Sequence, residues 1–312
     1  MLKDLQPSIF FVEETKMKRQ GQIKSKNSEK YVIYELIRKG RAGGGLAIGV
    51  VKELNPTWIS EGDNMTEILT VQVNAQDFAI RCVAGYGPQE NDLIDKKLKF
   101  WSKLGTEVED ADNLGLGFVL QFDGNLWAGA DLIPGDPNPI NNNGRLFKEF
   151  LAKYPNLTVI NSLSICQGLI TRRRTTVKKT EQSVIDFFVV CSRVIQFVEK
   201  MQIDEDRNYS LTNYNMKKGQ SRPVETDHNP LILDLNISFL KPTKQRMEIY
   251  NLKNLKCQEV FYEHTSNSTN LSECFLNSSS LKTQVENWEV NFSAAIRQCF
   301  KRIRITDNKN ES

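Results

Sequence analysis

Asp227 and His228 stand side by side at the entrance to an apolar run, where they could take part in metal-assisted or acid–base chemistry. Apolar residues follow at positions 231, 233, 235 and 237, and this period of two predicts a strand. Successive side chains of an extended backbone point in opposite directions, so Asp227 could face a cation while His228 faces a phosphate. Asp, Asn and Pro also favour turns for local reasons, so this motif alone is better explained as a turn.

Other polar residues upstream also follow apolar runs. A single acid at the end of a strand is common, but several in one chain indicate carboxylates gathered along one edge of stacked sheets. Their mutual repulsion would then require a cation. The full set is Glu14, Tyr86, Asp123, Asn125, Asp186, Asp227 and His228.

The apolar runs that would carry these residues are predicted to be short strands. They lie at 9–12, 46–50, 68–73, 78–83, 118–120, 157–161, 183–190 and 231–237, with a hairpin joining the third and fourth. Two amphipathic helices are predicted between strands. The first has its apolar face on Leu93, Phe100, Trp101, Leu104 and Val108, and the second on Leu146, Phe147, Phe150 and Leu151. The polar residues 204–224 are predicted to form a loop.

Two segments invite a phosphate-binding interpretation. The glycines at 41–51 match neither the dinucleotide-binding nor the P-loop pattern, and no helix obviously follows them, so a phosphate-binding loop is disfavoured. The basic run at 171–179 is explained equally well as a solvated loop or as a phosphate-contacting surface. On the second interpretation the nucleic-acid contacts are Lys16, Arg172, Arg173, Arg174 and Lys178.

Composition sets broad limits. The 312 residues are enough for one sizeable domain and an appendage, and a hydrophobic content of 39% supports a packed core. The net charge of +3 permits a polyanionic partner without requiring one. The six cysteines include no CxxC pair, which favours reduced thiols. No secretory segment and no apolar stretch of about 18 residues is present, so we expect an intracellular chain without a membrane partner.

A change of character after residue 240 predicts a domain boundary. Residues 241–244 resemble a linker, and apolar residues between Leu281 and Ile303 keep the spacing of an amphipathic helix. That helix is explained by docking on a neighbouring domain or, alternatively, by binding a partner. We therefore predict one domain at 1–240 and a linker with a helical extension at 241–312.

Five motifs occur in an order that resembles the endonuclease/exonuclease/phosphatase superfamily, which includes DNase I. They are Glu14-Thr15-Lys16, Tyr86-Gly87-Pro88, Asp123-x-Asn125, Ser183-x-x-Asp186 and Thr226-Asp227-His228-Asn229-Pro230. The segments 141–146, 157–161 and 183–186 are more narrowly similar to the endonuclease domains of non-LTR (LINE-type) retrotransposons. The resemblance implies an α/β (α+β) sandwich of two packed mixed sheets flanked by helices.

The resemblance also implies metal-assisted phosphodiester hydrolysis. Glu14, with Asp227 nearby, would bind Mg²⁺ or Mn²⁺ through carboxylate oxygens. Asp123 would orient or deprotonate the attacking water. The first strand of the superfamily, which supplies an Asn to the site, has no counterpart before Lys3, so the resemblance implies an N-terminal truncation.

Four further side chains receive roles from the same resemblance. Asn125 would hold the phosphate, and Tyr86 would hydrogen-bond a non-bridging oxygen. His228 would neutralise charge in the transition state, with Asp186 fixing its tautomer through the other ring nitrogen.

Three functions remain open from the sequence. The first is a DNA-nicking endonuclease, derived from a retrotransposon, that acts as a monomer and in the nucleus if DNA is its substrate. A reverse-transcriptase domain originally encoded downstream would be its partner. The second is a catalytically impaired relic that binds DNA, and the third is a phosphatase of the same superfamily acting on inositol phosphates or sphingolipids.

Overall fold

The computed structural model describes residues 5–17, 28–38, 44–62, 66–75, 78–175, 179–209, 212–217 and 220–237, with the short segments 249–250 and 302–303. The chain divides into two units, Met1–Thr243 and Lys244–Ser312. In the second unit, β17 (Ile249–Tyr250) pairs antiparallel with β18 (Arg302–Ile303). The helix predicted between Leu281 and Ile303 otherwise lies outside the described residues.

A six-stranded sheet forms the centre of the first unit. In spatial order its strands are β4 (Thr57–Glu61), β5 (Glu67–Asn74), β6 (Ala79–Tyr86), β7 (Gly117–Asp123), β12 (Asp186–Cys191) and β8 (Leu157–Val159). Only the β6–β7 pair is parallel. Every residue of β7 and β12 is buried, because both faces of this sheet are covered. That burial explains why these strands are continuous apolar runs.

A second β layer consists of two three-stranded sheets. One has the order β1 (Ile9–Glu13), β3 (Leu46–Val51) and β2 (Tyr31–Leu36), and the other has the order β16 (Leu231–Leu235), β13 (Val198–Ile203) and β9 (Cys166–Gln167). The ring of Phe11 in β1 lies 6.2 Å from that of Phe188 in β12, so the first of these sheets packs on the six-stranded sheet.

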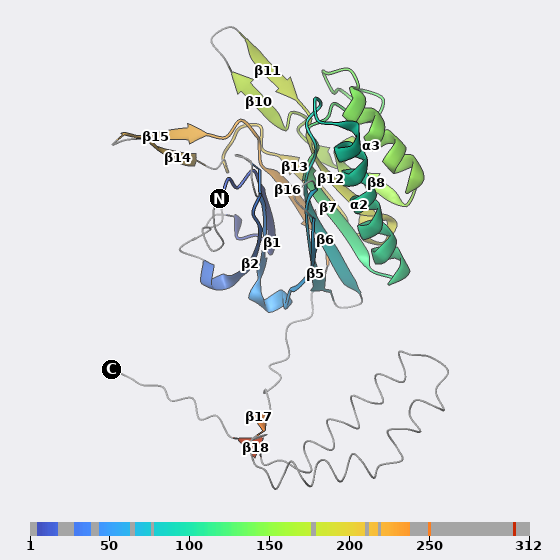
Figure 1. Cartoon of the computed structure of the whole chain (residues 1–312), viewed down its shortest axis with the longest axis vertical. Helices are drawn as coiled ribbons and strands as arrows, with labels where there is room; N and C mark the ends of the chain where they lie inside the picture. The colour runs from blue at the N-terminus through green and yellow to red at the C-terminus, as the bar shows by residue number, and fades with distance from the viewer. Residues whose placement is uncertain are drawn as a thin grey trace. The chain divides into compact units, whose positions relative to one another are not determined.

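The helices cover the opposite face of the six-stranded sheet from β1 and β2 (Figure 1). They are α2 (Ile94–Asn113) and α3 (Asn142–Lys153), with the short α4 (Ser192–Ile195) after β12. Trp101 of α2 stacks on Phe147 of α3, and both rings contact Phe122 of β7. The predicted face of α2 is buried except at Leu93, which precedes the helix and is 81% exposed. Among the described residues, no helix is long and apolar enough to cross a membrane.

Two hairpins correct the sequence-based prediction. The polar segment predicted as a loop at 204–224 contains β14 (Thr212–Lys217) and β15 (Gln220–Glu225), which pair with each other. The basic run likewise forms β10 (Arg172–Thr175), paired with β11 (Thr180–Ser183). Backbone pairing in a hairpin does not require apolar side chains, so the hydrophobic pattern gave no signal for them.

Candidate active site

Three of the predicted residues form a row across the six-stranded sheet. Tyr86 ends β6, Asp123 ends β7 and Asp186 begins β12, and the strand register pairs Tyr86 with Asp123 and Asp123 with Asp186. Because neighbouring positions in register lie side by side, the sheet itself brings these three residues together. Asn161 secures this end of β12: its Nδ2 donates to the Asp186 carbonyl at 3.0 Å and its Oδ1 accepts from Phe188 N.

The segment that carries Asp227 and His228 is hydrogen-bonded to the neighbouring segment at 171–173. Arg173 N donates to the Asp227 carbonyl at 2.8 Å, and Asn229 N donates to the Thr171 carbonyl at 2.6 Å. His228 forms an antiparallel bridge with Arg172, and β16 begins at Leu231, so the motif is a paired strand entrance rather than the turn that its composition alone favours. This entrance delivers both side chains to the end of the six-stranded sheet.

His228 forms with Asp186 the pair that the superfamily resemblance implies. His228 Nδ1 lies 3.0 Å from both carboxylate oxygens of Asp186. Burial of the imidazole opposes protonation, but the Asp186 carboxylate outweighs it and raises the pKa of His228 to about 10. The ring is therefore an imidazolium near neutral pH, with Nδ1–H donating to Asp186. Its Nε2–H is left at the cleft side, 4.0 Å from Asp227 Oδ1.

Asp123 is buried, and a carboxylate there is electrostatically costly. Burial, with the nearby charge of Asp186, raises the pKa of Asp123 to about 7. Glu13, which the sequence analysis did not select, also faces this group: its Oε1 accepts from Asp123 N at 3.0 Å. Burial of the Glu13 carboxyl, followed by repulsion from Asp186 and Asp123, raises its pKa well above the usual range. The sequence offered one signal for Glu13, which is an acidic residue directly before Glu14.

Glu14 reaches the same site from the end of β1. It holds a left-handed backbone conformation with φ of 49°, which a non-glycine residue adopts at some cost. Tyr86 Oη donates to Glu14 Oε1 at 2.7 Å, and Lys16 Nζ lies 3.1 Å from Glu14 Oε2. Burial opposes ionisation of Glu14, but these two contacts outweigh it and lower its pKa. Burial and the Glu14 hydrogen bond raise the pKa of Tyr86, so its hydroxyl stays protonated.

Behind Tyr86, an ion pair between Arg38 and Glu67 links the tyrosine ring to the backbone that follows Glu14. Arg38, paired with Glu67, places its guanidinium 5.2 Å from the centre of the Tyr86 ring. Glu67 Oε2 accepts from Gly45 N at 2.7 Å, and the Gly45 carbonyl accepts from Thr15 N at 3.1 Å. Together with the Tyr86–Glu14 hydrogen bond, these contacts form a closed ring that we call the Arg38–Glu67 clamp.

Asn125 is held by the ends of β6 and β7. Its Nδ2 donates to the Gly87 carbonyl at 2.9 Å, and its backbone N donates to Asp123 Oδ1 at 3.0 Å. Asn125 also has a left-handed φ, of 46°. A Cβ on Gly87 would lie 2.4 Å from the Gly124 carbonyl, so this close approach requires a glycine.

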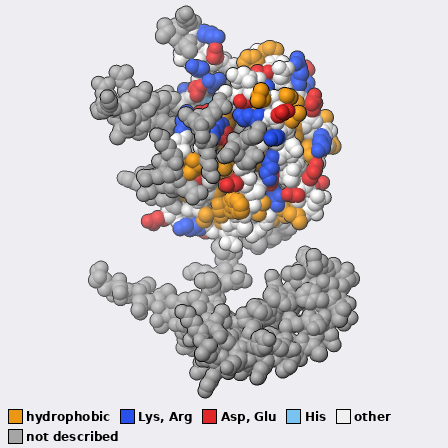
Figure 2. Space-filling view, in the orientation of Figure 1, with side chains coloured by type: hydrophobic (Ala, Val, Ile, Leu, Met, Phe, Trp, Pro, Cys, Tyr) orange, Lys and Arg blue, Asp and Glu red, His pale blue; other side chains and the backbone are white. Residues whose placement is uncertain are grey.

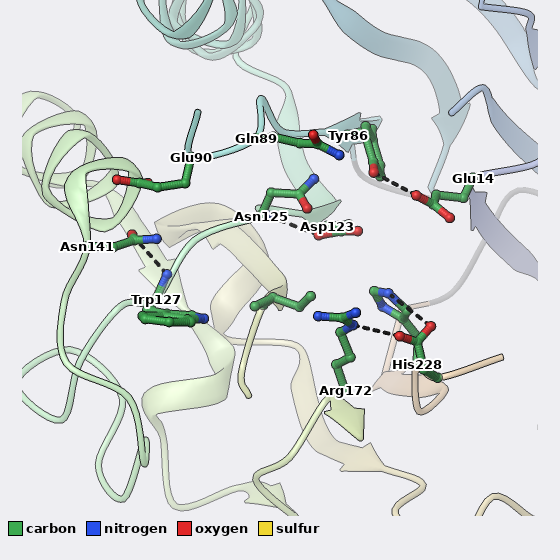
Figure 3. Close-up of a pocket in the computed structure, with 12 residues that line it drawn as sticks. Glu14, Tyr86, Gln89, Glu90, Asp123, Asn125, Trp127, Asn141, Arg172 and His228 are labelled. Carbon is green, nitrogen blue, oxygen red and sulfur yellow. Dashed lines mark hydrogen bonds and ion pairs between the residues drawn. The ribbon is translucent and has the colours of Figure 1, made fainter. Parts of the chain in front are cut away.

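These side chains open onto one cleft of about 460 Å³ (Figure 3). Asp186 lies behind His228 and does not line it. The residues that line the cleft are Glu14, Tyr86, Gln89, Glu90, Asp123, Asn125, Trp127, Asn141, Arg172, Ile185, Asp227 and His228.

The predicted nucleic-acid contacts are distributed unevenly. Arg172 lines the cleft and places Nε 2.8 Å from Asp227 Oδ2, whereas Arg173 pairs with Glu205 at 3.6 Å. Arg174 is exposed on β10, and Lys178 lies outside the described residues. Figure 2 shows basic and acidic side chains together along the β10–β11 hairpin, so its surface is of mixed charge.

The donor set fits a hard divalent cation. Asp123, Asp186 and His228 each offer one ligand atom, all within 4.8 Å of one another, although the hydrogen bond between His228 and Asp186 already accounts for their proximity. Glu14, Asp123 and Asp227 all present carboxylates to the cleft, the ligand type that Mg²⁺ and Mn²⁺ take. The sequence-based assignment of Glu14 and Asp227 as the ligands stays a prediction.

Comparisons with known proteins agree on the fold. The sequence matches no protein-family model and no curated protein. The catalytic domain of APE2 from Xenopus laevis superposes with a TM-score of 0.57 at 15% identity, covering 78% of this chain and 88% of that one. The endonuclease domain of TRAS1, a telomere-specific non-LTR retrotransposon, gives 0.52 at 15% identity, covering 75% and 89%.

A third similar solved structure is named as a member of the superfamily. It is an endonuclease/exonuclease/phosphatase family protein from Bacteroides thetaiotaomicron, with a TM-score of 0.50 at 15% identity, covering 75% of this chain and 86% of that one. These likenesses show that the chain has the DNase I-like fold, and the fold predicted from the sequence is confirmed.

Proposed function

We propose that this chain hydrolyses phosphodiester bonds of DNA in a reaction that depends on a divalent cation, and that it nicks one strand. The observation that carries the proposal is the convergence of the His228–Asp186 pair and Asp123 on a cleft lined by further carboxylates. We further propose that the chain derives from a non-LTR retrotransposon, for which the five ordered motifs are the support.

Asp123 is the general base of the proposed reaction. A pKa of about 7 lets its carboxylate exist at neutral pH and still accept a proton from water, the balance that an efficient base requires. Asn125 N donates to one carboxylate oxygen, Oδ1, and so fixes the direction in which Asp123 presents its other oxygen.

His228 acts as a fixed cation rather than as a base. Its pKa of about 10 keeps both ring nitrogens protonated at neutral pH, so Nε2–H can donate to a phosphate oxygen as negative charge develops. Asp186 orients the ring and stabilises its charge. Tyr86 also stays protonated; its hydroxyl donates to Glu14 in this structure, and we propose that it turns to a non-bridging phosphate oxygen when the substrate binds.

Mg²⁺ or Mn²⁺ bound by Glu14, with Asp227 nearby, would stabilise the negative charge of the reacting phosphate. Arg172 neutralises one oxygen of Asp227 and lines the cleft, so it lies where a substrate phosphate would pass. DNA is the proposed partner, contacted by Lys16 and by the basic residues of β10. We propose a monomer that acts in the nucleus, from an element that encoded a reverse transcriptase downstream.

Plasmid nicking tests this proposal. Supercoiled DNA with Mg²⁺ is expected to become open circular, and EDTA or the His228→Ala substitution should abolish the conversion. Lys148→Ala is a matched control, because this partly exposed cation on α3 pairs with Asp131 and does not line the cleft.

The same experiment separates the two alternatives. Retardation of the plasmid in a gel without nicking, at every metal concentration, would overturn the nuclease and support a DNA-binding relic. Release of phosphate from inositol phosphates under conditions that leave the plasmid intact would overturn it in favour of a phosphatase.

A further inference from the structure

The two ends of the cleft differ in chemistry. One end holds the ionised groups: the carboxylates of Glu14, Asp123 and Asp227, with the cations Arg172 and His228. The other end holds the aromatic ring of Trp127 and the side-chain amide of Asn141 (Figure 3). The proposed phosphate chemistry gives no role to the residues at this second end.

Trp127 is an exposed ring on a firmly held backbone. Its backbone N donates to Asn141 Oδ1 at 3.1 Å, and its carbonyl accepts from Asn141 N at 3.2 Å. A Cβ on Gly144, in the first turn of α3, would come within 2.0 Å of that carbonyl, so the helix end fits closely against it. The Trp127 residue nevertheless remains 41% exposed and lines the cleft (Figure 3).

The polar groups around this ring are neutral or already engaged. Both carboxylate oxygens of Glu90 accept from backbone N–H groups at the start of α3, at 3.2 Å each. Asn141 uses its Oδ1 for Trp127 N and Gly144 N, which leaves its amide NH₂ group without a partner among the described residues.

We propose that Trp127, with the amide of Asn141, forms a stacking subsite for a nucleobase next to the scissile phosphate. This inference rests on the proposed function, since it assigns the ionised end to the phosphate. A nucleotide joins a flat apolar ring with hydrogen-bonding edges to a charged phosphate, and the cleft presents groups suited to both parts. An aromatic ring stacks on any base, so the subsite tolerates different sequences.

The proposal narrows the substrate class. A base within a duplex hides both faces between its neighbours, so only an unpaired or displaced base can lie on Trp127. The preferred substrates are therefore single-stranded DNA and duplexes with an unpaired nucleotide at the cleavage site. An inositol phosphate carries no aromatic ring and would gain nothing from this end of the cleft.

The test compares two strands of equal charge. Binding of oligodeoxythymidylate and of an abasic deoxyribose-phosphate strand of the same length is measured by fluorescence anisotropy in EDTA, so that no cleavage occurs. The wild-type chain should bind the base-containing strand roughly tenfold more tightly, the effect of one stacked base. Trp127→Ala should bring the ratio close to one, and Trp127→Phe should retain most of it.

Trp58→Ala is the matched control, because Trp58 is 51% exposed on β4 and does not line the cleft. An unchanged ratio in Trp127→Ala, or an equal loss in Trp58→Ala, would overturn the subsite. Cleavage assays with Mg²⁺ on the same proteins report separately on the proposed function. A chain that discriminates the two strands but cleaves neither duplex nor single-stranded DNA would overturn the nuclease and not the subsite.

Discussion

The two halves of the site are built differently. Tyr86, Asp123 and Asp186 lie in one register row of a six-stranded sheet whose central strands are buried throughout. Glu14 and Asp227, by contrast, follow β1 and precede β16, strands that are mostly only partly buried. Among the described strands, β1 pairs only with β3 and β16 only with β13.

The two halves therefore hold their side chains in place in different ways. The row is fixed by strand register, because a residue there cannot move without moving the sheet. Glu14 is placed instead by the Arg38–Glu67 clamp, and Asp227 by the hydrogen bond from Arg173 N to its carbonyl. We therefore expect substitutions in the row to act on chemistry, and substitutions in the second half to act on geometry and cation affinity.

The largest effect is expected from Asp123→Asn, which changes the row without changing its shape. Loss of the base should lower kcat roughly a thousandfold, in the range typical of general bases. The neutral amide also removes a buried carboxylate that Asp186 repels, so the thermal midpoint above pH 7 should stay the same or rise. Nicking assays and thermal unfolding of the same preparation test this. Unchanged nicking would rule out the assigned role, and a lower midpoint would contradict the repulsion.

Glu14→Gln tests the second half of the site, which the strands of the second β layer carry. The amide keeps the acceptor for Tyr86 but is a weaker cation ligand, so kcat at low Mg²⁺ should fall roughly a hundredfold. Because the remaining carboxylates still line the cleft, higher Mg²⁺ should restore part of the activity. The measurement is nicking rate against Mg²⁺ concentration for both proteins. A loss that no Mg²⁺ concentration changes would argue against Glu14 as a ligand.

The same contrast explains what the sequence could predict. Strands such as β7 and β12 were found because burial on both faces demands continuous apolar runs. Tyr86 and Asp123 were found because they follow such runs, whereas Asp186 was expected inside the strand at 183–190 and instead begins β12. Arg38 and Glu67 were missed because their contacts join residues 29 apart in the chain, which no local pattern records. The β10–β11 and β14–β15 hairpins were missed because their side chains are largely polar.

Glu67→Gln is expected to have a smaller effect, since it acts on Glu14 and Tyr86 only through the clamp. Weakening the ion pair with Arg38 should lower kcat about tenfold and leave the substrate KM nearly unchanged. Glu107→Gln is the control, because Glu107 is also buried and lies 3.6 Å from Arg81 but does not line the cleft. Both variants should lose stability. Equal losses of kcat in the two would show that the clamp does no more than stabilise the fold.

The smallest effect on catalysis accompanies a change of stability with pH, which reports on the His228–Asp186 pair, one of the contacts that join the two halves. The pKa of His228 rises from 6.5 to about 10 on folding, so its contribution is complete below pH 6.5 and is lost as the pH rises towards 10. In EDTA the thermal midpoint should therefore fall by up to roughly ten degrees across that interval. In Asp186→Asn the charge that raises this pKa is absent, so the fall should be shallower and should end at lower pH.

The chain has two histidines, so the imidazole NMR signals of a His264→Ala background follow the titration of His228 directly. A midpoint for His228 near 6.5 in the wild-type chain would mean that Asp186 does not hold the imidazolium, and the segment at Asp227 would then be held mainly by its contacts with residues 170–173.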